Sequence, residues 1–103
     1  MLFIETPIFR ESWEDLGQDD DDLSALQTVL MINPDAGDLI QHSRGLRKIR
    51  VGAKGKGKRG GARVIYYWHK GDGQIFLLLA YPKNERDDLT HQQIAVLRNL
   101  VDQ

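Results

Sequence analysis

The chain has 103 residues, of which 41% are hydrophobic and 28% charged, so it predicts one globular domain, residues 1–103. It contains no cysteine, which excludes disulfides, zinc–thiolate sites and thiol nucleophiles. No apolar run is long enough to span a membrane, and the first residues do not have the pattern of a secretory signal. A cytoplasmic protein is therefore expected.

The net charge of −1 hides a strong separation of charge along the chain. Residues 1–41 contain ten acidic residues and one basic residue, whereas residues 42–70 contain ten basic residues and no acidic one. A surface that serves only solubility normally mixes both signs. The basic segment therefore predicts an anionic polymer as the partner, and a solvated lysine-rich loop is the alternative interpretation.

The first third of the chain predicts a strand and two helices. A short strand is expected at residues 2–4, and Thr6-Pro7 is typical of a helix start. The acidic run 19–22 places negative charge where a second helix begins, and Asn33-Pro34 ends that helix. The acidic run is interpreted as a helix start rather than as a metal site.

From residue 46 onward the apolar period is that of a strand. In the segment 46–51, Ile49 and Val51 alternate with Lys48 and Arg50, which predicts a half-buried strand with a cationic outer face. A basic, glycine-rich loop follows over residues 52–61. It formally matches Gly-x-Gly-x-x-Gly, but a β-rich segment follows where a dinucleotide-binding fold requires a helix.

The rest of the chain completes a small sheet. Residues 63–68 and 75–80 are expected to be strands joined by a turn at 71–73, and the second strand is apolar on both faces. Thr90 and Gln93 form a capping box that starts a C-terminal helix. The sequence thus predicts an α+β fold, with a small, largely antiparallel sheet, an N-terminal helical hairpin on one face, and a C-terminal helix.

The histidines do not suggest a metal centre, because His42, His69 and His91 lack the paired spacing of metal ligands. His69, at the end of a strand, is expected to be structural rather than catalytic. By alternation Tyr67 shares a face with Arg63, which predicts that a nucleobase stacks on Tyr67 beside the arginine.

A cationic segment without carboxylates limits the chemistry that it can perform. It offers no oxygen ligands for Mg²⁺, but arginine and lysine stabilise the charge that builds on a phosphate during attack. A lysine among other cations has a lowered pKa and can act as a general base. RNA supplies its own nucleophile, the 2′-hydroxyl, so the segment predicts RNA cleavage without metal or cofactor.

Three segments carry a resemblance to a known family. Lys54–Tyr67 (KGKGKRGGARVIYY), the strand Gly45–Val51 and Tyr81–Glu85 (YPKNE) resemble the RelE/HigB-type toxins of bacterial toxin–antitoxin systems, the HigB branch most of all. The resemblance spans nearly the whole chain and implies a RelE-like fold. It also implies a ribosome-dependent endoribonuclease that cuts mRNA by 2′-hydroxyl attack without metal, and a cognate antitoxin that is usually a DNA-binding protein.

Chemistry and resemblance together give two sets of candidate residues. The catalytic candidates are Lys56, Lys58, Arg59, Arg63, Tyr81, Lys83 and Asn84. The RNA-binding candidates are Lys48, Arg50, Lys54, Lys56, Lys58 and Tyr67. Asn84 stands where RelE-type enzymes have an arginine and Thr90 where they have a catalytic tyrosine, so the identity of the general base stays open.

Two other functions stay open from the sequence. A non-catalytic module that binds RNA or the ribosome would use the same basic segment without turnover. A toxin of the same fold that poisons DNA gyrase would not require the clustered lysines and arginines. Incubation with ribosomes and a defined mRNA distinguishes these alternatives from an endoribonuclease.

Overall fold

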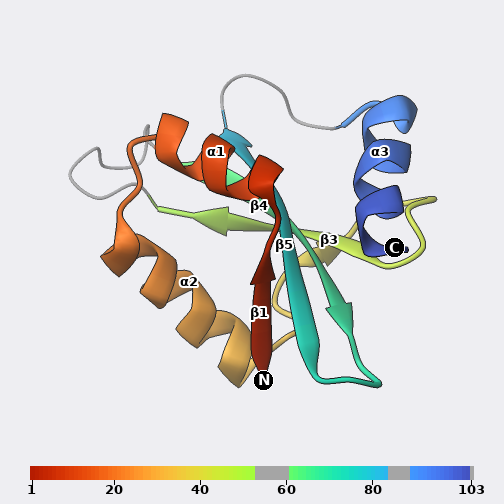
Figure 1. Ribbon diagram of the computed structural model, residues 1–103, viewed down its shortest axis with the longest axis horizontal. Coiled ribbons are helices and arrows are strands. Elements are labelled where there is room, and N and C mark those ends of the chain that lie inside the picture. The colour runs from red at the N-terminus through yellow and green to blue at the C-terminus, as the bar shows by residue number, and fades with distance from the viewer. Residues whose placement is uncertain (53–60, 84–88, 103) are drawn as a thin grey trace.

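The computed structural model describes residues 1–52, 61–83 and 89–102. Over these residues the chain forms one five-stranded sheet and three helices (Figure 1). In chain order the elements are β1 (Leu2–Glu5), α1 (Pro7–Asp15), α2 (Asp20–Ile32), β2 (Asp38–Leu39), β3 (Leu46–Val51), β4 (Ala62–His69), β5 (Gln74–Pro82) and α3 (His91–Val101). The predicted α+β fold is confirmed. The strand β2 was not predicted, because two residues are too few to show a periodicity.

The strands follow the order β1-β5-β4-β3-β2, with β4 in the middle. The β1 strand runs parallel to β5, and every other neighbouring pair is antiparallel. The register between β4 and β5 shifts at one point: Ile65 faces Leu79, whereas the next residue, Tyr66, faces Leu77. The strand β5 therefore contains one extra residue, Leu78, which forms a β-bulge.

The helices α1 and α2 lie on one face of the sheet. Their buried residues form an apolar cluster with the side chains that β4 and β5 direct to this face; the buried members are Phe9, Trp13, Leu26, Leu30, Val64, Tyr66, Ile75, Leu77 and Ala80. The rings of Phe9 and Trp13 stack with centroids 5.4 Å apart. Burial of this apolar surface is the main source of stability on this face.

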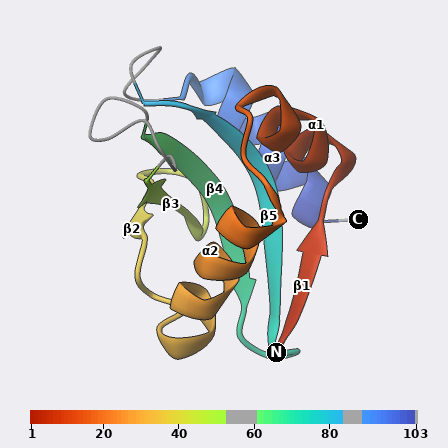
Figure 2. The same cartoon turned by 90° about the vertical axis from the view of Figure 1, so that its left-hand side faces the viewer.

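The helix α3 covers the opposite face, so β5 is apolar on both sides, as the sequence predicts. Figure 2 shows α2 in front of the sheet and α3 behind it. The second cluster consists of Leu46, Ile65, Leu78, Tyr81, Leu89, Ile94 and Leu97. The predicted capping box is confirmed, because the amide of Gln93 donates to Thr90 Oγ1 at 3.1 Å and the amide of Thr90 donates to Gln93 Oε1 at 2.8 Å. No helix in the described ranges is both long and apolar enough to cross a membrane.

A buried tyrosine fixes the segment that leads into β2. The Tyr66 side chain is fully buried; its hydroxyl donates to the carbonyl of Pro34 at 2.7 Å and accepts from the amide of Gly37 at 2.9 Å. Only glycine fits at position 37, since a Cβ atom there would lie 2.7 Å from Tyr66 Cε1 and 2.8 Å from the carbonyl oxygen of Lys48. Burial raises the pKa of Tyr66 above its usual value of 10.0, although the hydrogen bond from Gly37 opposes the shift.

This tether predicts a pH dependence of stability in alkali. Because the folded state binds the phenolic proton more tightly than the unfolded chain does, the stabilisation is complete below about pH 10 and is lost as the pH rises through the raised pKa. Tyr66→Phe removes this titration and leaves two backbone groups without a partner, which is expected to lower the free energy of unfolding by about 1–3 kcal/mol at pH 7. Urea unfolding between pH 7 and 11 measures both effects. An equally steep loss of stability above pH 10 in Tyr66→Phe would contradict the assignment.

Candidate functional site

Two arginines and a tyrosine form a row across three strands. In the sheet register Arg50 of β3 faces Arg63 of β4, and Arg63 faces Tyr81 of β5. Ile49 and Val51 pack against the cluster under α1 and α2, so the alternation of β3 directs Lys48 and Arg50 to the α3 face, as predicted. Tyr81 is buried in the cluster on that same face. Residues far apart in sequence thus place a cationic row on one surface.

The Nε atom of Arg63 has no acceptor among the described residues. The side chain is partly buried, and none of the described residues accepts a hydrogen bond from its buried Nε. Buried donors are almost always paired, and guanidinium groups pair with carboxylates and phosphates through charge-assisted hydrogen bonds. The arrangement suits an anion that arrives with a ligand.

Lys83 directly follows β5 and lies two residues after Tyr81 of the row. Its amide donates to the carbonyl of Gly61 at 3.1 Å, which continues the pairing of β4 and β5 by one step. Its side chain runs beside Gly61, because a Cβ atom built on that glycine would lie 3.8 Å from Lys83 Cδ. A Cβ atom at position 61 would therefore make ordinary van der Waals contact with the lysine.

An open groove of about 500 Å³ follows the basic residues along β3. It is lined by Ala36, Asp38, Lys48, Ile49, Arg50 and Arg63. Asp38 is its one carboxylate, and nowhere in the described part of the chain do three or more histidine, aspartate or glutamate side chains gather as metal ligands. The groove can hold a phosphate against three cationic side chains.

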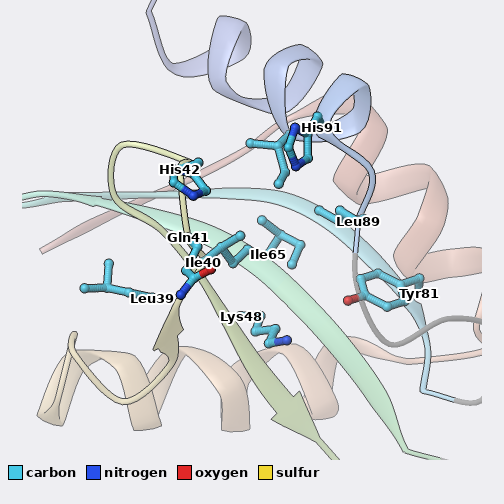
Figure 3. Close-up of a pocket in the computed structure, with 10 residues that line it drawn as sticks. Leu39, Ile40, Gln41, His42, Lys48, Ile65, Tyr81, Leu89 and His91 are labelled. Atoms are coloured by element: carbon cyan, nitrogen blue, oxygen red, sulfur yellow. The ribbon is translucent and has the colours of Figure 1, made fainter.

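A second, more enclosed hollow of about 350 Å³ adjoins this groove on the α3 side (Figure 3). It is lined by Leu39, Ile40, Gln41, His42, Lys48, Ile65, Tyr81, Leu89, His91 and Ile94. Lys48 belongs to both hollows, which are therefore neighbours at this lysine. Sequence reasoning did not group His42 and His91, because no local spacing connects a loop before β3 with the first turn of α3.

Tyr67 does not lie with the cationic row. It lies four positions after Arg63 on β4, and this spacing corresponds to roughly 13 Å in an extended chain. Its ring packs against Phe76, and the guanidinium carbon of Arg98 lies 4.7 Å from its centroid. The Tyr67 ring is half-buried, and base stacking on it stays a prediction.

Two further side chains have structural partners. His69 lies at the turn after β4, where its Nδ1 is 3.1 Å from Asp72 Oδ2, in keeping with the structural role expected for it. Thr90 caps α3 through its hydroxyl and so takes no tyrosine-like position in the row. The remaining sequence candidates lie outside the described residues: Lys54, Lys56, Lys58, Arg59 and Asn84.

Comparison with known proteins agrees with this geometry. The family model for the RelE toxin of the RelE/RelB toxin–antitoxin system matches residues 17–103. Among solved structures, the chain is similar to the E. coli toxin RelE, a double arginine-to-alanine mutant in the free state. The TM-score is 0.60 at 10% identity, over 97% of this chain and 95% of that chain, a likeness of fold. Since the family model covers most of its length, this chain belongs to the RelE toxin family.

Proposed function

We propose that this protein is a toxin that cuts mRNA on the ribosome, and that residues 1–103 act as a single domain. The observation that carries the proposal is the row of Arg50, Arg63 and Tyr81, with Lys48 and Lys83 beside it on the same face. Membership of a family of toxins that are generally ribonucleases supports it. The KGKGKRGG run further supports placing the chain in the HigB branch of that family.

The proposed reaction needs no group beyond the protein and the RNA. The 2′-oxygen attacks the adjacent phosphorus, a cyclic 2′,3′-phosphate forms, and the bond from phosphorus to the 5′-oxygen breaks. Arg63 stabilises the charge that develops on the phosphate, while Lys48 and Arg50 hold the backbone. Tyr81 and Lys83 are the described candidates for removing the proton of the 2′-hydroxyl and for protonating the leaving oxygen.

The glycine-rich segment is proposed to dock the RNA. Lys54, Lys56 and Lys58 alternate with glycines and supply three positive charges for contacts with RNA phosphates. Arg59 precedes the stiffer strand β4 and is proposed to assist Arg63, and Asn84 to assist Lys83. Lys56 or Lys58 remains an alternative general base.

The proposed partners follow from the proposed reaction. They are mRNA with the ribosome, and a cognate antitoxin that binds DNA and silences the toxin. Because ribosomes are the place of action, the protein is proposed to work in the cytoplasm. Two alternatives are a module that binds the ribosome without turnover and a toxin that poisons gyrase. The decisive experiment distinguishes both of them from an endoribonuclease.

The decisive experiment offers a defined mRNA on ribosomes and identifies the ends of the fragments. The expected products carry a cyclic phosphate or 3′-phosphate on one fragment and a 5′-hydroxyl on the other. Replacing the 2′-hydroxyl by hydrogen at the cut nucleotide alone is expected to abolish cleavage, since it removes the nucleophile. Intact mRNA bound with the protein would favour a binding module, and inhibition of gyrase supercoiling without cleavage would favour a gyrase poison.

Chelation tests the role of metals. Ribosomes themselves require magnesium, so the substrate is a short free RNA at high protein concentration. Cleavage is expected to persist in EDTA, because arginine and lysine supply the positive charge at the phosphate. Loss of cleavage in EDTA with recovery on adding Mg²⁺ would contradict the proposed reaction.

A further inference from the structure

The second hollow, of about 350 Å³, lies beside the cationic row. We propose that it is a nucleobase subsite, which takes the base of one nucleotide next to the phosphate held by Arg63. This inference rests on the proposed function. It adds that the site selects its RNA by the base next to the bound phosphate. Three observations support it. Hydrogen bonds hold the loop before β3, the pocket walls combine apolar and hydrogen-bonding side chains, and Lys48 lines both the pocket and the groove.

The loop that presents His42 is fixed by a buried serine. Ser43 is 2% exposed; its hydroxyl donates to the carbonyl of Ile40 at 2.6 Å and accepts from the amide of Leu46 at 3.0 Å. The amide of Ile40 also donates to the carbonyl of Leu46 at 2.9 Å and closes the turn. Within this turn His42 has a φ of 61°, a left-handed conformation that persists only where the surroundings impose it. These hydrogen bonds fix the backbone that presents Gln41 and His42 to the pocket.

The opposite wall is the start of α3. His91 is the first residue of the helix, directly after the cap Thr90. Leu89 and Ile94 pack in one cluster with Ile65 of β4 and close the pocket with apolar surface. Figure 3 shows His42 and His91 above the sheet, with Ile65 between them and Lys48.

The walls match the chemistry of a base better than that of a free anion. One side of the pocket is aliphatic and accommodates the face of a flat ring, while Gln41, His42 and His91 offer groups that hydrogen-bond to the edge of a base. A phosphate alone would leave the aliphatic wall unused. The volume is within the range of roughly 300–1,000 Å³ in which small-molecule sites fall.

The pocket is also placed correctly relative to the backbone site. Lys48 lines both the pocket and the groove with Arg50 and Arg63, and Tyr81 lines the pocket and pairs with Arg63. On β3, Lys48 and Arg50 are two residues apart, which is about 7 Å along a strand. One nucleotide can therefore lay its phosphate on the arginines and insert its base beneath His42 and His91.

Binding is tested without turnover by NMR of the histidine ring protons. The protein is titrated with AMP, GMP, CMP and UMP in turn, and with inorganic phosphate. At least one nucleotide is expected to shift the His42 and His91 signals while leaving those of His69, at the distant β4–β5 turn, unchanged. No shift with any nucleotide, equal shifts at all three histidines, or the same shifts with phosphate alone would overturn the subsite.

Selectivity is tested on RNAs that differ at one position beside the cut. His42→Gly removes the imidazole and suits the left-handed backbone, so the loop keeps its shape. His42→Gly and Gln41→Ala are expected to reduce the preference between bases at that position roughly tenfold, the scale of one lost edge contact. His69→Ala is the matched control and is expected to leave the preference unchanged. An unchanged preference in both pocket variants would overturn the subsite, whereas shifted histidine signals without any RNA cleavage would refute the proposed function and leave a nucleotide site.

Discussion

Replacing Arg63 with alanine is expected to lower the rate of RNA cleavage roughly 10²–10³-fold, the usual scale for losing one donor to a transition state. The guanidinium lies between Arg50 and Tyr81, and its Nε has no acceptor among the described residues. Over the described part of the chain, this buried donor is therefore left without an acceptor. Removal of this donor is expected to leave the free energy of unfolding unchanged or slightly higher, as happens where function conflicts with stability.

Two measurements test this expectation. Single-turnover cleavage at saturating protein gives the rate, and urea unfolding gives the stability. Arg10→Ala is the matched control, because Arg10 lies on α1 at the other face and its side chain pairs at the surface with Glu5 at 3.2 Å. A stably folded Arg63→Ala protein that cuts at the wild-type rate would assign the phosphate to other cations, with Lys83 the first to examine.

Replacing Phe9 with alanine is expected to lower the free energy of unfolding by roughly 3–5 kcal/mol, the range for truncating a buried phenylalanine. Phe9 is fully buried, stacks on Trp13, and belongs to the cluster that joins α1 to β5. Its loss leaves a cavity between the helix and the sheet. Because a typical domain has about 5–15 kcal/mol of stability, the change is expected to bring this protein close to unfolding.

Ile8→Ala on the same helix is the control for Phe9→Ala. Ile8 is 39% exposed and lies outside the buried cluster, so its truncation is expected to cost less than Phe9→Ala by several-fold. Urea unfolding of the three proteins measures the difference. Equal losses for the two variants would show that α1 contributes to stability through its helix propensity rather than through Phe9.

Much of the fold could be predicted because local signals set it. Asp19 begins α2 through a capping box, and the alternation of β3 gave the faces of Lys48 and Arg50 correctly. For the second face of β4 the sequence indicated a nucleobase at Tyr67, and it did not reveal that the ring packs against Phe76 and Arg98. The pattern of one strand does not reveal which helix will pack on it, because that packing depends on contacts distant in sequence.

The site was predictable only as a set of residue types. The absence of acidic residues from the segment 42–70 pointed to a phosphate, and the resemblance to RelE/HigB-type toxins singled out Arg63. The pocket was not found, since His42 and His91 are joined only through the sheet between them. Each histidine alone resembles an ordinary surface residue, and their common role depends on the tertiary structure.

The bulge at Leu78 decides which side chains of β5 lie on the face that carries Arg63. Before it, Ile75 and Leu77 face α1 and α2; after it, Ala80 faces them and Tyr81 faces α3, so the odd and even positions exchange sides. Thr6 and Ser12 of the opposite layer hold this change of phase, through hydrogen bonds to the carbonyls of residues 77 and 78 and from the amide of Ala80. The face on which Tyr81 lies therefore depends on the number of residues in β5. Without the extra residue, Tyr81 would point toward α1 and α2 instead of α3.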